Sequence, residues 1–159
     1  MKASKTLTDN MQAVLVELIE LHLQGKQAHW NVVGKNFRDM HLQLDEIIDD
    51  ARLFADQMAE RMRALHAVPD GRSGSVAKGT TLNQFPAGLV STKDTVTMVV
   101  AMLEGTVKTM RDVHDQIDEE DPTTADILHA FIEKLEQYAW MVDAENMEPT
   151  ATVTQPAKA

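Results

Sequence analysis

The chain contains no cysteine among its 159 residues, which excludes disulfide bonds, thiolate metal sites and cysteine nucleophiles. It also lacks an apolar run long enough to cross a bilayer, since the longest such run extends only from Met98 to Leu103. The N-terminal residues MKASKTLTDN do not include the apolar stretch of a signal peptide. We therefore expect a soluble protein of the cytoplasm with no membrane partner.

Basic residues are scarce, because 15 Lys and Arg stand against 25 Asp and Glu and give a net charge of -10. Proteins bind nucleic acid chiefly by placing Lys and Arg against phosphate groups, so this balance argues against a general DNA-binding surface. An acidic surface suits cations better, although it equally serves plain solubility.

Strand-like alternation is absent, and apolar residues recur at helical spacing through most of the chain. A first helix is predicted to begin at Thr8 or Asp9 and to end before Gly34. Asn36 is the predicted cap of a second helix, which ends near His66 because Pro and Gly residues follow closely.

Residues 69–91 form a long connection, in which we expect one short extra helix around Leu82–Phe85. The third helix is predicted to open at Thr92, and Thr123 or Thr124 is the predicted cap of the fourth. Four amphipathic helices with one long connection between the second and third predict an all-α, ferritin-like four-helix bundle.

The bundle is assigned to residues 9–147, with a mobile N-terminal arm over residues 1–8. Residues 148–159 are predicted to form a disordered C-terminal tail, because PTATVTQPAKA has too few apolar residues to pack. A fold of this kind does not by itself name a function.

The second predicted helix carries a stripe of potential metal ligands, namely His41, Asp45, Asp56 and Glu60. Each pair is four residues apart, and Asp45 precedes Asp56 by about three whole helical turns, so all four lie on one face. The stripe flanks the apolar core positions. It therefore faces something outside the subunit's own bundle.

Distance along the helix decides how this stripe can bind metal. Asp45 and Asp56 lie roughly 16 Å apart at about 1.5 Å per residue, too far to hold one ion in a straight helix. They can share an ion if a second copy of the helix packs antiparallel about a two-fold axis near residues 50 and 51. The spacing thus predicts two equal metal sites at a homodimer interface.

The turn at Gly34 folds the end of the first helix back, so that His29 can approach His41. Imidazole with carboxylates suits Fe(II) and other first-row divalent metals, and zinc can also occupy such a site. Each pair taken alone can equally be a solvated face, and His29 can be a hydrogen-bonded core histidine. Because one two-fold arrangement can bring all five residues together, a metal site is favoured over coincidence.

Two segments resemble the signatures of the Dps family, the DNA-binding proteins from starved cells. HWNVVGKNFRDMH, from His29 to His41, is similar to the first signature, and DQMAERMRAL, from Asp56 to Leu65, is similar to the second. The similarity is tightest over residues 26–69. The helices predicted for the rest of the chain fit the architecture of the family.

The resemblance implies a hollow dodecamer with ferroxidase centres at its two-fold interfaces. There an oxidoreductase reaction oxidises Fe(II), typically with hydrogen peroxide, and the ferric product is stored as a mineral. His29, His41 and Asp45 match the ligands from one subunit, and Asp56 and Glu60 match those from its partner. Consuming peroxide and free iron together would protect the cell and its DNA from oxidative damage.

Two further residues match positions beside the family's centre. Trp30 corresponds to a tryptophan that quenches oxidising equivalents, although read alone it is a large packing anchor. Lys26 is a candidate partner of the ligands or, equally, a solvated lysine. His66 stands where relatives often have Gly, Asp or Asn, which bears on the geometry of the helix end.

The sequence departs from the family where DNA binding is concerned. In relatives that activity often depends on a basic terminus, which would associate the protein with the nucleoid. Here the N-terminal arm carries only Lys2 and Lys5, and the C-terminal tail carries only Lys158. We expect DNA binding to be weak or absent at physiological salt.

Acidic residues cluster around the last loop, in the region that lines three-fold iron-entry pores in the family. Asp121 and Asp126 are the pore candidates, and a solvated acidic loop is the alternative. The di-iron motif inside true ferritins, Glu-x-x-His, does not occur. Its nearest match, Asp126-x-x-His129, lacks a partner motif and is interpreted as a polar surface.

Overall fold

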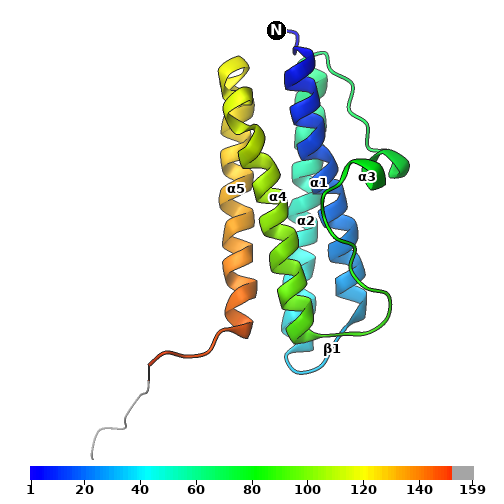
Figure 1. Ribbon diagram of the computed structural model, residues 1–159, viewed down its shortest axis with the longest axis vertical. Coiled ribbons are helices and arrows are strands. Elements are labelled where there is room, and N and C mark those ends of the chain that lie inside the picture. The colour runs from blue at the N-terminus through cyan, green and yellow to red at the C-terminus, as the bar shows by residue number, and fades with distance from the viewer. Residues whose placement is uncertain (152–159) are drawn as a thin grey trace, which may run out of the picture.

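The computed structural model describes residues 1–151, and these form a four-helix bundle with one long crossover (Figure 1). The elements follow one another as α1 (Lys5–Asn31), β1 (Val32–Val33), α2 (Phe37–Ala64), α3 (Ser73–Gly79), β2 (Val90–Ser91), α4 (Thr92–Glu120), α5 (Pro122–Asp143) and the 3-10 turn η1 (Ala144–Asn146). This confirms the all-α, ferritin-like prediction.

The helices pair as α1 with α2 and α4 with α5, and α1 also packs along α4 (Figure 1). The connection after α2 returns along the whole bundle before α4 begins, so α2 and α4 run in the same direction. β1 and β2 form a two-residue parallel pair in which Val32 is opposite Val90. This pair was not predicted. It ties the end of α1 to the start of α4.

Apolar side chains from all four long helices fill one continuous core. Phe54 of α2 and Phe131 of α5 stack at its centre with ring centroids 4.2 Å apart. Each fully buried Leu, Met or Phe contributes about 1.5–3 kcal/mol through removal of apolar surface from water. No helix within residues 1–151 has the length and apolarity needed to cross a membrane.

The first helix begins earlier than predicted. Ser4 caps it by accepting a hydrogen bond from the Leu7 amide, and Leu7 is fully buried. The side chain of Ser4 also binds Glu120 at the end of α4. Residues 5–8 are therefore helical, and this corrects the boundary of the arm predicted over residues 1–8.

The second helix begins as predicted but is capped differently. Asn36 has a left-handed backbone with φ 56° and makes no side-chain cap; its amide instead donates to Glu145. His66 ends α2 with φ 62°, the region that Gly and Asn adopt most readily.

The short helix of the crossover lies over Ser73–Gly79, so the prediction around Leu82–Phe85 is wrong. Asp70 organises the start of α3 by accepting hydrogen bonds from the Arg72 backbone and side chain. Leu82 and Phe85 are buried anchors of an extended segment. Their apolar character reflects docking onto the bundle rather than helix formation.

A buried carboxylate on α1 holds the crossover in place. Glu17 accepts three hydrogen bonds of 2.7–2.8 Å, from the hydroxyl groups of Thr80 and Thr81 and from the Thr81 amide. Its side chain is 2% exposed. The crossover is thus fastened to α1 by a polar contact that replaces the hydration of the carboxylate.

The third predicted helix, α4, begins at Thr92 as predicted, whereas α5 begins two or three residues earlier than the predicted caps Thr123 and Thr124. Ser91 caps α4 by accepting from the Asp94 amide, and Asp121 is the N-cap residue of α5, with Pro122 in its first turn. Pro fits there because the first helical amide needs no partner. Most of the tail predicted over residues 148–159 lies outside the described residues.

Candidate metal centre

The end of α1 and the start of α2 bring two histidines together across a tight turn. Gly34 has φ 117°, a conformation open to glycine, and lets the chain reverse between the helices. Farther along, a Cβ on Gly25 would lie 3.1 Å from Ile48, so the missing side chain lets α1 and α2 approach closely. His29 and His41 then stack with ring centroids 3.6 Å apart.

The two imidazoles hold each other in one tautomer. The Nδ1 of His29 lies 2.9 Å from the carbonyl oxygen of His41, and the Nδ1 of His41 lies 2.9 Å from that of His29. A carbonyl oxygen only accepts, so each Nδ1 carries the proton and donates. Both Nε2 lone pairs are left free, which is the form in which histidine binds a metal.

Asp45 completes a compact group on the same end of the bundle. Ligand atoms from His29, His41 and Asp45 all lie within 4.8 Å of one another, and this is the one such group of three found within residues 1–151. The Oδ1 of Asp45 also lies 3.3 Å from the Nδ1 of His29. The predicted approach of His29 to His41 and Asp45 is therefore present in the subunit.

Lys26 of α1 lies beside this group. Its Nζ donates to the Oδ1 of Asp45 over 2.8 Å. This hydrogen bond, aided by the charges of His29 and Lys26 itself, holds the pKa of the Asp45 carboxyl below its ordinary value. Asp45 thus stays an anionic ligand under mildly acidic conditions, and a bound cation would have to compete with the ammonium.

Asp56 and Glu60 do not join the group within the subunit. Both are exposed on α2, farther along the same helix. The rise of about 1.5 Å per residue puts Asp56 roughly 16 Å from Asp45. The structure thus separates the five predicted ligands into a converged set of three and a distant, exposed set of two.

Known proteins resemble this chain in both sequence and architecture. The model of the ferritin-like domain matches residues 8–148. The DNA protection during starvation protein of Mycolicibacterium smegmatis is 31% identical over 147 residues, covering 90% of this chain and 78% of its own length. The chain belongs to the Dps family of ferritin-like proteins.

Two more known proteins are similar to this chain. The structure of Dps from Microbacterium arborescens in the high iron form superposes with a TM-score of 0.86 at 28% identity, covering 93% of this chain and 99% of that one. The fine tangled pili major subunit of Haemophilus ducreyi is 33% identical over 138 residues, covering 87% of this chain and 73% of its own.

Trp30 follows His29 and has 67% of its surface exposed in this Dps subunit. It therefore does not act as a packing anchor inside the bundle, the interpretation that its size alone suggested. A large aromatic residue left open beside the ligand group is available to a neighbouring chain or to the site.

The two pore candidates differ sharply in their surroundings. Asp121 is 5% exposed, and its oxygens accept from the Arg61 guanidinium over 2.7 and 2.9 Å and from the Thr124 hydroxyl. Burial by itself raises the pKa of Asp121, but the bonds from Thr124 and Arg61 outweigh it and lower the pKa. Asp126 is exposed on α5. Asp121 is thus engaged within the subunit, and Asp126 keeps the open carboxylate that a pore requires.

Sequence reasoning missed the role of Arg61. It follows Glu60 in the second signature, and it connects α2 to the start of α5 by binding Asp121 and the Thr124 hydroxyl. Those partners lie 60 or more residues away along the chain. Helical periodicity carries no information about such a contact, which only the packed bundle provides.

Proposed function

We propose that this Dps chain is the subunit of an iron-oxidising mini-ferritin that binds Fe(II) between two-fold-related subunits. The observation that carries the proposal is the reciprocal pair of hydrogen bonds between His29 and His41. It leaves both Nε2 atoms free, in a group whose ligand atoms from His29, His41 and Asp45 lie within 4.8 Å of one another. Two imidazoles and a carboxylate with open coordination positions suit Fe(II), the metal that must also meet an oxidant.

The partner subunit supplies the remaining carboxylates in this proposal. An antiparallel copy of α2 about a two-fold axis near residues 50 and 51 would bring Asp56 and Glu60 of the partner subunit to the group of His29, His41 and Asp45. Their exposure in the single chain supports this, since carboxylates used between subunits must be open before assembly.

The reaction takes Fe(II) as its substrate. Two Fe(II) ions give one electron each to hydrogen peroxide, which with two protons yields two Fe(III) ions and two water molecules. The protein's contribution is to hold the ions together in anionic and imidazole ligands that stabilise the higher charge of the product. Asp45, kept ionised beside Lys26, provides part of that negative charge.

Storage follows from assembly into a hollow dodecamer, in which Fe(III) collects as a mineral. Asp126 is the remaining pore candidate for iron entry, since its carboxylate is exposed. Zn²⁺ competes for the same imidazole ligands. The name of the mycobacterial relative, with that of the high-iron structure, supports a protective and iron-related role.

DNA binding is proposed to be weak. Lys5 lies inside α1 and pairs with Asp9, so it is not part of a free basic arm. Only Lys2 then precedes the helix. With a chain charge of -10, the assembly would repel phosphate, and we expect protection of DNA to come from iron and peroxide removal.

The test is a double variant, Asp45→Ala with Glu60→Ala, assayed for Fe(II) oxidation by stoichiometric peroxide. We expect a loss of most of the rate above the protein-free control, with the assembly unchanged in gel filtration. The matched control is Asp39→Ala with Glu46→Ala, which removes two exposed carboxylates of α2 that point about 100–120° away from Asp45. Unchanged kinetics in the first variant would refute the proposal.

A further inference from the structure

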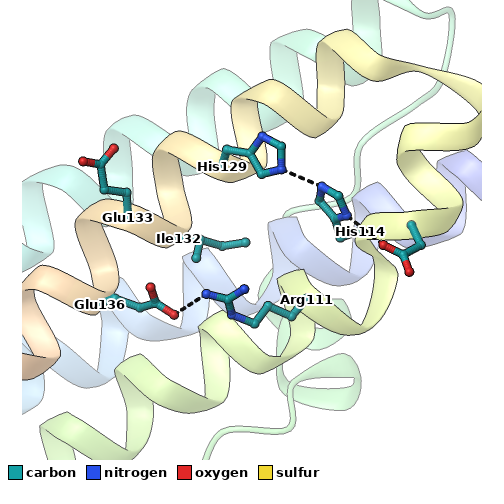
Figure 2. Close-up of a pocket in the computed structure, with 7 residues that line it drawn as sticks. Arg111, His114, His129, Ile132, Glu133 and Glu136 are labelled. Atoms are coloured by element: carbon teal, nitrogen blue, oxygen red, sulfur yellow. Dashed lines mark hydrogen bonds and ion pairs between the residues drawn. The ribbon is translucent and has the colours of Figure 1, made fainter.

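A second pair of histidines lies on the other half of the bundle. His114 of α4 and His129 of α5 point toward each other across the groove between these helices, with their Nε2 atoms 2.7 Å apart (Figure 2). They line an open pocket of about 390 Å³. The pocket lies toward the end where α4 passes into α5, whereas the turn between α1 and α2 is at the opposite end (Figure 1).

A carboxylate lies on the far side of each imidazole. The Oδ1 of Asp115 is 3.0 Å from the Nδ1 of His114, and the Oδ1 of Asp126 is 3.7 Å from the Nδ1 of His129. An ionised carboxylate only accepts hydrogen bonds, so it favours a proton on the Nδ1 that faces it. The hydrogen bond to Asp115 biases His114 toward the tautomer whose Nε2 carries a lone pair, whereas Asp126 acts on His129 through its charge alone.

Two lone pairs facing each other at 2.7 Å repel unless a cation lies between them. A neutral hydrogen bond between the rings would place one unprotonated Nδ1 against its carboxylate, which is electrostatically unfavourable. The contact is completed by a proton held between the two Nε2 atoms or by a metal ion that takes its place. The geometry favours the metal, because an oriented Nδ1–H with a free Nε2 is the state that metal-binding histidines adopt.

The nitrogen spacing is close to what coordination needs. Metal–nitrogen distances of about 2.0–2.1 Å place two imidazole nitrogens about 2.9 Å apart at the right angle of octahedral coordination and about 3.4 Å apart at the tetrahedral angle. The side chain of His129 is 60% exposed, so it can move the few tenths of an ångström required. Glu133, one turn after His129, lines the same pocket but points away from the histidine pair (Figure 2), so water would fill the other coordination positions.

The charge around the pair also suits a cation. Asp115, Asp126 and Glu133 surround it, while the nearby Arg111 is neutralised by an ion pair of 2.5 Å with Glu136. We propose that His114 and His129 chelate a divalent first-row transition-metal ion of the imidazole-preferring class, such as Zn²⁺, Co²⁺ or Ni²⁺. This site is separate from the group of His29, His41 and Asp45 and does not depend on iron oxidation.

The experiment is a Co²⁺ titration of the assembled protein, followed by calorimetry and by the visible absorbance of bound Co²⁺. The Asp45→Ala, Glu60→Ala background weakens binding at the proposed iron site. We expect His129→Gln in that background to remove one Co²⁺ per chain, and His114→Gln to do the same. Asp115→Asn should weaken binding about 10- to 100-fold, because it removes the partner that orients His114.

The matched control is His66→Asn, which removes an exposed histidine at the end of α2 and should leave the titration unchanged. Equal Co²⁺ stoichiometry and affinity in the parent, His114→Gln and His129→Gln proteins would overturn the proposal and leave a shared proton only. Crystals of the unaltered protein soaked in Zn²⁺ give a check that needs no variant. Anomalous density between the two Nε2 atoms supports the site, and its absence overturns it.

Discussion

Mixing two inactive variants of this chain should restore part of its iron oxidation, because the proposed ligands come from two subunits. Asp45→Ala removes the carboxylate that lies with His29 and His41. Glu60→Ala removes a carboxylate that the same chain cannot bring to that group. The two residues are fifteen positions apart on α2, which is about 22 Å along a straight helix.

The size of the recovery follows from two-fold symmetry. In a random one-to-one mixture, about half of the dimers contain one chain of each kind. Such a dimer has one site that lacks both carboxylates and one site with all its ligands. About a quarter of all sites are then intact, so the rate should reach about a quarter of the unaltered rate.

The assay is peroxide-driven Fe(II) oxidation on co-expressed variants, with differently tagged chains used to verify mixed assemblies. Each variant assembled alone should stay near the protein-free rate. Separately purified variants that are combined without exchange of subunits provide the control, and they should show no recovery. A verified mixed assembly that remains as slow as the single variants would refute ligand sharing across the two-fold axis.

Three other perturbations follow from contacts within the subunit. Asp121→Asn breaks the buried pair with Arg61 and should lower the free energy of unfolding by about 3 kcal/mol at neutral pH, measured by urea denaturation at fixed protein concentration. Because the pKa of Asp121 is lower in the folded state, its ionised form stabilises the fold above the pKa of the unfolded chain, and this stabilisation is lost on acidification. The difference in unfolding free energy between Asp121→Asn and the unaltered protein should therefore shrink in acid. Glu17→Ala leaves three hydrogen-bond donors of the crossover without an acceptor, so it should lower the free energy of unfolding by about 2–4 kcal/mol. Residues 69–91 should also be cleaved faster by proteases. A free energy of unfolding equal to that of the unaltered protein would contradict this prediction. Lys26→Met removes the hydrogen bond that lowers the pKa of Asp45, so the acid limb of the oxidation rate should move to higher pH; an unmoved pH profile would show that Lys26 does not influence the site.

The approach of His29, His41 and Asp45 to one another could be predicted from the sequence because a single helix carries two of the three residues. Spacing of four residues between His41 and Asp45 fixes their common face whatever surrounds the helix. His29 could be added because one short turn, opened by Gly34, separates its helix from theirs. The bundle itself followed from helical periodicity and one long connection, both of which are local properties of the chain.

Contacts between distant segments could not be predicted in the same way. The position of α3 depends on hydrogen bonds around Asp70, whereas the apolar residues Leu82 and Phe85 suggested a helix where the chain is extended. Asp121 looked like an open acidic residue because its partner Arg61 lies on another helix. The approach of His114 to His129 likewise arises only when α4 and α5 pack.

Fe(II) oxidation by stoichiometric peroxide, followed by optical absorbance on protein sized by gel filtration, tests the central claim most directly. The ligand group of His29, His41 and Asp45 predicts oxidation well above the protein-free control, about two irons per peroxide, and a ferric product that stays in solution within a cage-sized particle. A correctly assembled particle that oxidises Fe(II) no faster than buffer would contradict the proposed function.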